Sequence, residues 1–200
     1  MNKTKGFLSL LSAGFLFGMF GIFVRLLNSE MTNFQQIFFR SIVGFILASG
    51  IIILFKRKVS IRNISLVNLL LFAISLPLTI VFYTLSILKT KIIVAVAALF
   101  LGSILFSLVA GILFFKEKLT VKKGLAIISS ILALYFFAIP FSFQNINIGL
   151  VFGVLSGFMD VLSNTFKKHL GGKVDRFLLV SIQMVGTIIV SFVLMLYIPN

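Results

Sequence analysis

The chain has 200 residues, of which 60% are hydrophobic and only 11% are charged. A soluble domain carries about 25% charged residues, so this composition is typical of a membrane protein and excludes a separate soluble domain. Eighteen Lys and Arg residues stand against four acidic residues, and no cysteine is available for a disulfide or a thiolate metal site. Because the positive charges lie in short loops between apolar runs, we predict a protein that partners the lipid bilayer and not nucleic acid.

Seven stretches are long and apolar enough to cross a membrane, for which a helix needs about 20 residues. Open strands cannot cross the hydrocarbon core, and these runs lack the alternation of a barrel. We therefore predict an all-α polytopic membrane protein with about seven transmembrane helices. They cover Phe7–Leu27, Phe34–Phe55, Ile64–Leu88, Ile92–Phe115, Gly124–Phe143, Ile148–Phe166 and Phe177–Ile198.

The basic residues orient these spans. Fourteen Lys and Arg residues precede the first span or lie in the loops after the second, fourth and sixth, and three lie on the other side. The positive-inside rule then places the N-terminus in the cytoplasm and the C-terminal end of this chain outside. A composition rich in Lys, Ile, Phe and Asn is associated with AT-rich prokaryotic genes, so we expect the plasma membrane of a prokaryote.

The first span carries Gly14 and Gly18, at a spacing that lets two helix backbones approach closely. In the second span, Asn33, Gln36 and Arg40 are spaced i, i+3 and i+7 and therefore share one helix face. Two interpretations of Arg40 stay open. It extends to the outer headgroups, or it faces a wet cavity and meets an anionic group.

The third span carries a polar stripe of Ser75, Thr79, Tyr83 and Ser86, which either lines a cavity or bonds the helix to its neighbours. Pro77 lies in the same span and must leave one backbone carbonyl without its helical partner.

Small residues in the fourth span, Ser103, Ser107 and Gly111, predict a helix-packing face. After this span we expect Glu117 to form a local ion pair among lysines. Thr120 is suited to cap the start of the fifth helix.

The sixth span is two-sided. Gly149, Gly153 and Gly157 form a ladder of packing glycines, and the same face continues to Asp160 and Asn164, whereas the opposite face is bulky and apolar. A carboxylate this deep in the membrane indicates a functional site, or a structural Asp bonded to neighbouring polar groups. Both interpretations stay open. No motif for a metal or a cofactor is present, and we expect neither.

The start of the chain resembles this sixth span. At an offset of 143 positions, Gly6 matches Gly149, Gly14 matches Gly157, Phe15 matches Phe158, and Phe23 matches Phe166. We therefore predict a first repeat of five helices over residues 1–143 and a partial second repeat of two helices over residues 144–200.

The segments Phe82–Gly102 and Phe114–Gly124, with Arg40 early in the second span, resemble the drug/metabolite transporter superfamily in its EamA-like branch. In the second segment, Glu117, Leu119, Thr120 and Gly124 fill the family's pattern. The resemblance implies two five-helix repeats of inverted topology, with a substrate site near the midplane between them. The second copy is incomplete here, so we expect a homodimer or another chain to complement it.

We therefore expect a secondary transporter that exports a small polar or amphipathic metabolite by alternating access. The candidate substrate-binding or coupling residues are Gln36, Arg40, Tyr83, Asp160 and Asn164. One alternative is a truncated, non-transporting remnant or an accessory subunit, which would carry no flux. The other is a small membrane enzyme, which would need clustered acid–base groups that this sequence lacks. We expect no enzyme.

Overall fold

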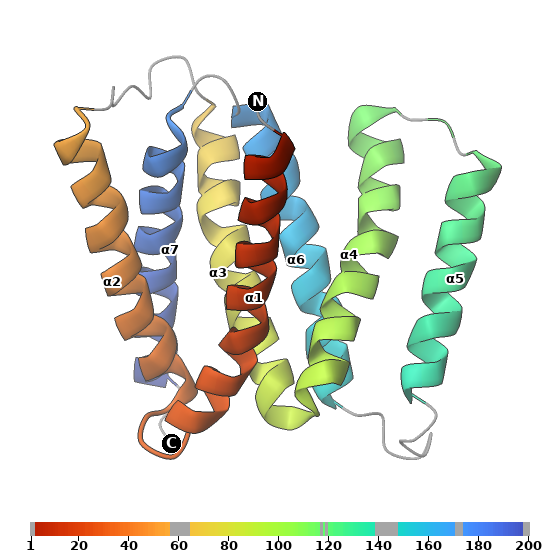
Figure 1. The fold of residues 1–200 in the computed structure, drawn as a ribbon, viewed down its shortest axis with the longest axis horizontal. Coiled ribbons are helices and arrows are strands. Elements are labelled where there is room, and N and C mark those ends of the chain that lie inside the picture. The colour runs from red at the N-terminus through yellow and green to blue at the C-terminus, as the bar shows by residue number, and fades with distance from the viewer. Residues whose placement is uncertain are drawn as a thin grey trace.

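The computed structural model describes residues 3–56, 65–116, 118, 120–138, 148–170 and 174–197, and every regular element in these ranges is an α-helix (Figure 1). The predicted all-α architecture is therefore confirmed. The helices are α1 (Lys3–Leu27), α2 (Asn33–Leu54), α3 (Leu66–Lys89), α4 (Ile92–Phe115), α5 (Val121–Ala138), α6 (Ile148–Leu170) and α7 (Arg176–Tyr197).

Six of these helices, all except α5, are long and apolar enough to span a membrane. Helix α5 has 18 described residues and begins with the charged pair Lys122 and Lys123 just inside its first turn. The fifth predicted span ran to residue 143, and its last five residues lie outside the described part of the chain. The chain is thus a multi-pass membrane protein with six clear spans and a seventh helix beside them.

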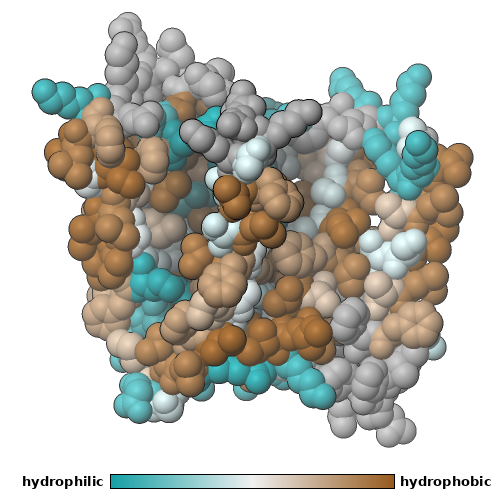
Figure 2. All heavy atoms as spheres, in the orientation of Figure 1, coloured by the Kyte–Doolittle hydropathy of each residue, from teal (hydrophilic) through white to brown (hydrophobic). Residues whose placement is uncertain are grey.

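The helices run side by side, and α1 begins at the opposite end of the bundle from the end of α7 (Figure 1). The helix ends that flank the three basic loops lie at the same end as the start of α1. Brown hydrophobic surface covers the middle of the molecule, and teal surface gathers toward both ends (Figure 2). The common end for the basic loops agrees with the charge pattern, and its assignment to the cytoplasm stays a prediction.

Helix α6 packs most extensively against α3 and α4, and α2 packs against α7. Helix α5 contacts α4 and stands apart from the other helices (Figure 1). Three buried clusters join the helices: the first links α1, α3 and α4, the second links α3, α6 and α7, and the third links α2 and α3. They comprise Val24, Tyr83, Ile87, Ala95 and Leu99; Phe72, Leu170, Val174 and Leu179; and Phe34, Ile37 and Val81.

Helix α3 continues through Pro77 as one element. Proline has no N–H to donate to the carbonyl four residues earlier, which is that of Ala73. Gly186 of α7 lies against this carbonyl, because a Cβ added to Gly186 would collide with the Ala73 oxygen. The backbone of α7 at Gly186 therefore lies close to the Ala73 carbonyl, which has no helical partner because of Pro77.

The five predicted packing glycines fall into two groups. A Cβ on Gly153 would lie 2.5 Å from Ala98 Cβ, and one on Gly157 would lie 2.5 Å from Leu99 O. Gly149 is buried, and its carbonyl accepts a 2.6 Å hydrogen bond from Ser86 Oγ. Gly14 and Gly18 do not pack in this way, because a Cβ on either would meet nothing within 4 Å. The prediction was wrong for these two, which lie on an exposed face of α1.

Candidate functional site

Most side chains of the polar stripe of α3 form hydrogen bonds within the helix bundle. Ser75 Oγ donates to Phe72 O at 3.2 Å and Thr79 Oγ1 donates to Ser75 O at 3.0 Å, both within α3. Ser86 bonds α6 through Gly149. Tyr83 differs, because its hydroxyl is buried and has no hydrogen-bond partner among the described residues. Most of the stripe is therefore structural, and Tyr83 is its candidate functional member.

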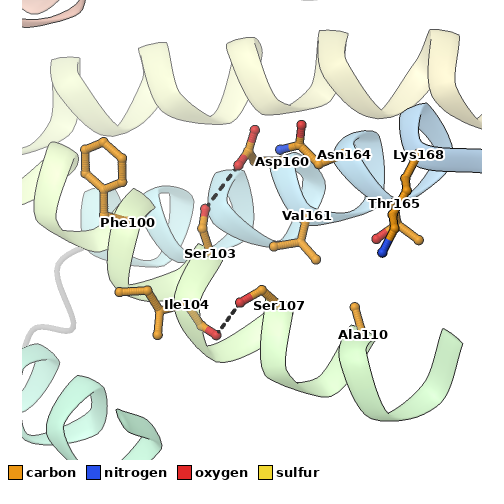
Figure 3. A pocket seen from close by; sticks show the side chains of 10 residues that line it. All are labelled: Phe100, Ser103, Ile104, Ser107, Ala110, Asp160, Val161, Asn164, Thr165 and Lys168. Atoms are coloured by element: carbon orange, nitrogen blue, oxygen red, sulfur yellow. Dashed lines mark hydrogen bonds between the residues drawn. The ribbon is translucent and has the colours of Figure 1, made fainter. Parts of the chain in front are cut away.

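A pocket of about 380 Å³ lies between α4 and α6 (Figure 3). Its α4 wall comes from Phe100, Ser103, Ile104, Ser107 and Ala110, and its α6 wall from Asp160, Val161, Asn164, Thr165 and Lys168. Two of the predicted site residues, Asp160 and Asn164, therefore share one pocket. The glycine ladder ends one turn before Asp160, so the helices touch along the ladder and separate beyond it.

Ser103 is one described polar neighbour of the Asp160 carboxylate, alongside Asn164. Its hydroxyl lies 3.4 Å from Asp160 Oδ2 and also 3.4 Å from Gly157 O, so it donates to only one of them at a time (Figure 3). Asp160 is partly exposed to the pocket, and Lys168 lines the same pocket two turns further along α6. The carboxylate can therefore accept a proton or a cationic group from the pocket.

Arg40 lies on the other side of the bundle. Its guanidinium carbon is 4.4 Å from the centre of the Phe20 ring of α1. Its Nη2 is buried and has no hydrogen-bond partner among the described residues. The same holds for both polar side-chain atoms of Asn33, two turns earlier on α2, and for Gln36 Oε1, one turn earlier.

Aromatic rings link the two sites. The Phe20 ring, over which the Arg40 guanidinium lies, stacks on Tyr83 with ring centroids 5.6 Å apart. Tyr83 also stacks on Phe17 with centroids 5.6 Å apart. Phe17 contacts Phe100, at 6.0 Å, and Phe100 lines the Asp160 pocket. The structure thus brings Asp160 and Asn164 together in one pocket, whereas Gln36 and Arg40 lie on α2 and Tyr83 belongs to the ring stack, and no described pocket contains all five residues.

Sequence reasoning missed three residues that contribute to these sites. Ser103 was interpreted as a packing residue, although its position on the small face of α4 could have suggested a partner for a buried acid. Phe17 and Phe20 carried a weaker signal, their i, i+3 spacing, which places them on one face of α1.

The family model described as "EamA-like transporter family" matches residues 4–139. The chain belongs to this family. The match covers α2 to α5 and all of α1 except its first residue, which agrees with the resemblance to the drug/metabolite transporter superfamily. Neither a curated protein nor a solved structure matches the chain. As an EamA-like protein with several membrane-spanning helices, the chain is of transporter type.

Proposed function

We propose that this EamA-like protein is a secondary transporter that exports a small polar or amphipathic metabolite by alternating access. The observation that carries the proposal is the Asp160 pocket between α4 and α6. A carboxylate inside a membrane-spanning helix and open to a pocket is suited to bind protons or a cationic group. We assign coupling to Asp160 and substrate contact to Asn164.

The two walls of the pocket belong to different predicted repeats. Transporters built from inverted repeats hold the substrate near the midplane and rock one repeat against the other. The close α4–α6 contact at Gly153 and Gly157 would act as the pivot of such a movement. The Asp160 pocket follows this contact along α6. A movement of α6 relative to α4 would therefore change access to Asp160 and Asn164.

The position of the pocket along α6 supports the outward direction. Its α6 residues run from Asp160 to Lys168, toward the end of the bundle where α1 begins. The excess of basic residues predicts that this end faces the cytoplasm. At the other end, Ser86 bonds Gly149 and Arg25 bonds the backbone that joins α3 to α4. A pocket approached from the cytoplasm and closed at the outer end is the arrangement in which an exporter loads substrate.

Flux through proteoliposomes tests this proposal. The purified chain would be given an isotope-labelled extract of small prokaryotic metabolites under an imposed pH gradient, and the trapped compounds would be identified by mass spectrometry. We expect accumulation of at least one compound that depends on the gradient. Asp160→Asn should abolish the dependence on the gradient, because an amide cannot take up the coupling proton.

Asp175→Asn is the matched control. Asp175 Oδ1 accepts a 2.9 Å hydrogen bond from Phe177 N, outside the pocket, and an Asn oxygen can replace it. This variant should transport normally. If the wild-type chain accumulates nothing beyond empty liposomes, the transporter proposal fails and the accessory-subunit alternative is favoured. If Asp160→Asn transports with unchanged pH dependence, Asp160 has no role in coupling.

A further inference from the structure

We propose that the α4–α6 pocket binds an anionic phospholipid from the bilayer, with the phosphate at the basic end of the bundle and one acyl chain along the apolar wall of the pocket. The lipid is a resident ligand and not the transported substrate. The inference therefore goes beyond the proposed function and does not depend on it. It combines three features of the pocket, which are its open side, its length and the lysines at one end.

The pocket is open along the side of the helix bundle. On its α4 wall, Phe100 is 51% exposed and Ile104 is 42% exposed, and both lie in the middle part of this membrane-spanning helix. Asn164 of the α6 wall is exposed as well. Helix α5 packs on α4, and α4 lies between α5 and α6 (Figure 1). At the depth of the hydrocarbon core, the exposed apolar rim of the pocket therefore meets lipid chains.

The length of the pocket matches one leaflet. Its α4 wall runs from Phe100 to Ala110, and Phe100 and Lys168 lie at opposite ends of the pocket (Figure 3). At 1.5 Å per residue this wall extends about 15 Å, which is half of the ~30 Å hydrocarbon core. Together with Ile104 and Val161, these residues give the wall a largely apolar surface. An acyl chain from the leaflet at the basic end would therefore cover the wall over its whole length.

Lysines surround the end of the pocket where that leaflet has its headgroups. Lys168 lines the pocket, and Lys167 precedes it in the last turn of α6. The end of α4 and the start of α5 add three exposed lysines, which are Lys116, Lys118 and Lys122. Figure 2 shows hydrophilic surface at these ends of α4 and α5. The sequence places one acid, Glu117, among them, so the region keeps a positive excess. Basic pockets of this kind between membrane-spanning helices bind phosphate-bearing lipid headgroups.

The positions of the two charges in the pocket also suit an amphipathic lipid. Asp160 and Lys168 are eight residues apart on α6, which is about 12 Å along the helix axis. A phosphate at Lys168 therefore stays away from the carboxylate, and only an uncharged acyl chain lies at the depth of Asp160. A soluble anion such as inorganic phosphate would gain the lysines but not the apolar wall, so the lipid is the better ligand.

Photocrosslinking of the full chain in nanodiscs tests the inference. The discs consist of dioleoylphosphatidylcholine with a small fraction of phosphatidylglycerol that carries a diazirine group on one acyl chain, and labelled peptides are identified by mass spectrometry. The lipid-exposed residues Val43, Ile46 and Leu47 of α2 serve as the reference face. We expect the α4 and α6 walls of the pocket to be labelled at least about threefold more than this face. The same diazirine chain on a phosphatidylcholine headgroup should label the pocket about threefold to fivefold less, because that headgroup has no net charge.

Variants locate the headgroup. Lys168→Gln should lower labelling of the pocket by about threefold to fivefold, since one lysine near the membrane surface contributes about this factor to the binding of an anionic lipid. Lys56→Gln is the matched control, because Lys56 is also exposed but follows α2, which packs against α7 and not at the pocket. This variant should be labelled as the wild type is. Unlabelled phosphatidylglycerol should compete with the probe, and inorganic phosphate in millimolar excess should not.

Four results would overturn the inference. They are equal labelling of the pocket and the α2 face, equal labelling by the two headgroups, equal labelling of the Lys168→Gln and Lys56→Gln variants, and displacement of the probe by inorganic phosphate. The first, second and fourth use the wild-type chain, so they do not depend on the folding of a variant. Selective labelling without any flux would reject the proposed function alone, and flux with uniform labelling would reject this inference alone.

Discussion

Helices α1 and α6 carry similar glycine spacing but lie in different surroundings. Gly14 of α1 and Gly157 of α6 are 143 positions apart and match in the predicted repeat. A Cβ on Gly157 would lie 2.5 Å from both Leu99 O and Ser103 N, whereas a Cβ on Gly14 would meet nothing within 4 Å. The spacing of small residues therefore permits close approach without ensuring it, and the facing helix determines whether it happens.

The two helices are held by different interactions. Helix α6 touches α3 and α4 through its glycines, so backbone and small side chains are in direct contact. Helix α1 is held by aromatic rings and by Arg25, whose Nη2 donates to Ile87 O at 3.2 Å and also to Thr90 O. Arg25 also brings a positive charge to the C-terminal end of α3, where the helix dipole favours it.

The largest effect is expected for Gly157→Ala. The added methyl group would collide with the backbone of α4, which cannot rotate away as a side chain could. We expect the free energy of unfolding to fall by about 3 kcal/mol. Loss of the monodisperse gel-filtration peak on heating in detergent measures this change. A variant as stable as the wild type would mean that α4 and α6 are not in contact at this point.

Arg25→Gln should have an intermediate effect. It removes a charged donor from two backbone carbonyls at the end of α3, and the contact is only partly buried. We expect the free energy of unfolding to fall by about 1–2 kcal/mol. The same thermal assay applies, with the exposed Arg176→Gln as the control. Equal stability of the two variants would show that Arg25 does not hold α1 against α3.

Gly14→Ala should have the smallest effect. The methyl group enters open space on the exposed face of α1, so the free energy of unfolding should change by no more than about 0.5 kcal/mol. Because it is the same substitution at the matched position, it is the direct control for Gly157→Ala. A large loss of stability would mean that another surface covers this face of α1 in the folded protein.

Much of the fold could be predicted because each span is apolar over its whole length. The predicted starts and ends of the second, third, fourth and seventh spans lie within two residues of the observed helices, and the sixth span starts where predicted but ends four residues later. The division of α6 into a face of small residues and a bulky apolar face could also be predicted from the sequence. The face of small residues does contact α3 and α4.

The candidate sites were only partly predictable. Asp160 and Arg40 stand out in sequence, since a charge inside an apolar span is costly. Their neighbours do not stand out, because Ser103 lies 57 residues from Asp160 and Phe20 lies 20 residues from Arg40. The sequence suggested one cavity for all five candidate residues, whereas no described pocket contains all five.

By itself, the sequence determined that the chain is an all-helical membrane protein, where six of its spanning segments lie, and that its basic loops share one end. These properties follow from hydrophobic transfer and charge, which depend on each segment separately. Only the tertiary structure decided that the glycines of α6 meet a neighbour and those of α1 do not. It also decided that aromatic rings separate Arg40 from Asp160. Such contacts depend on how each helix is rotated and shifted against helices distant in the chain, and the periodicity of a single span does not contain that information.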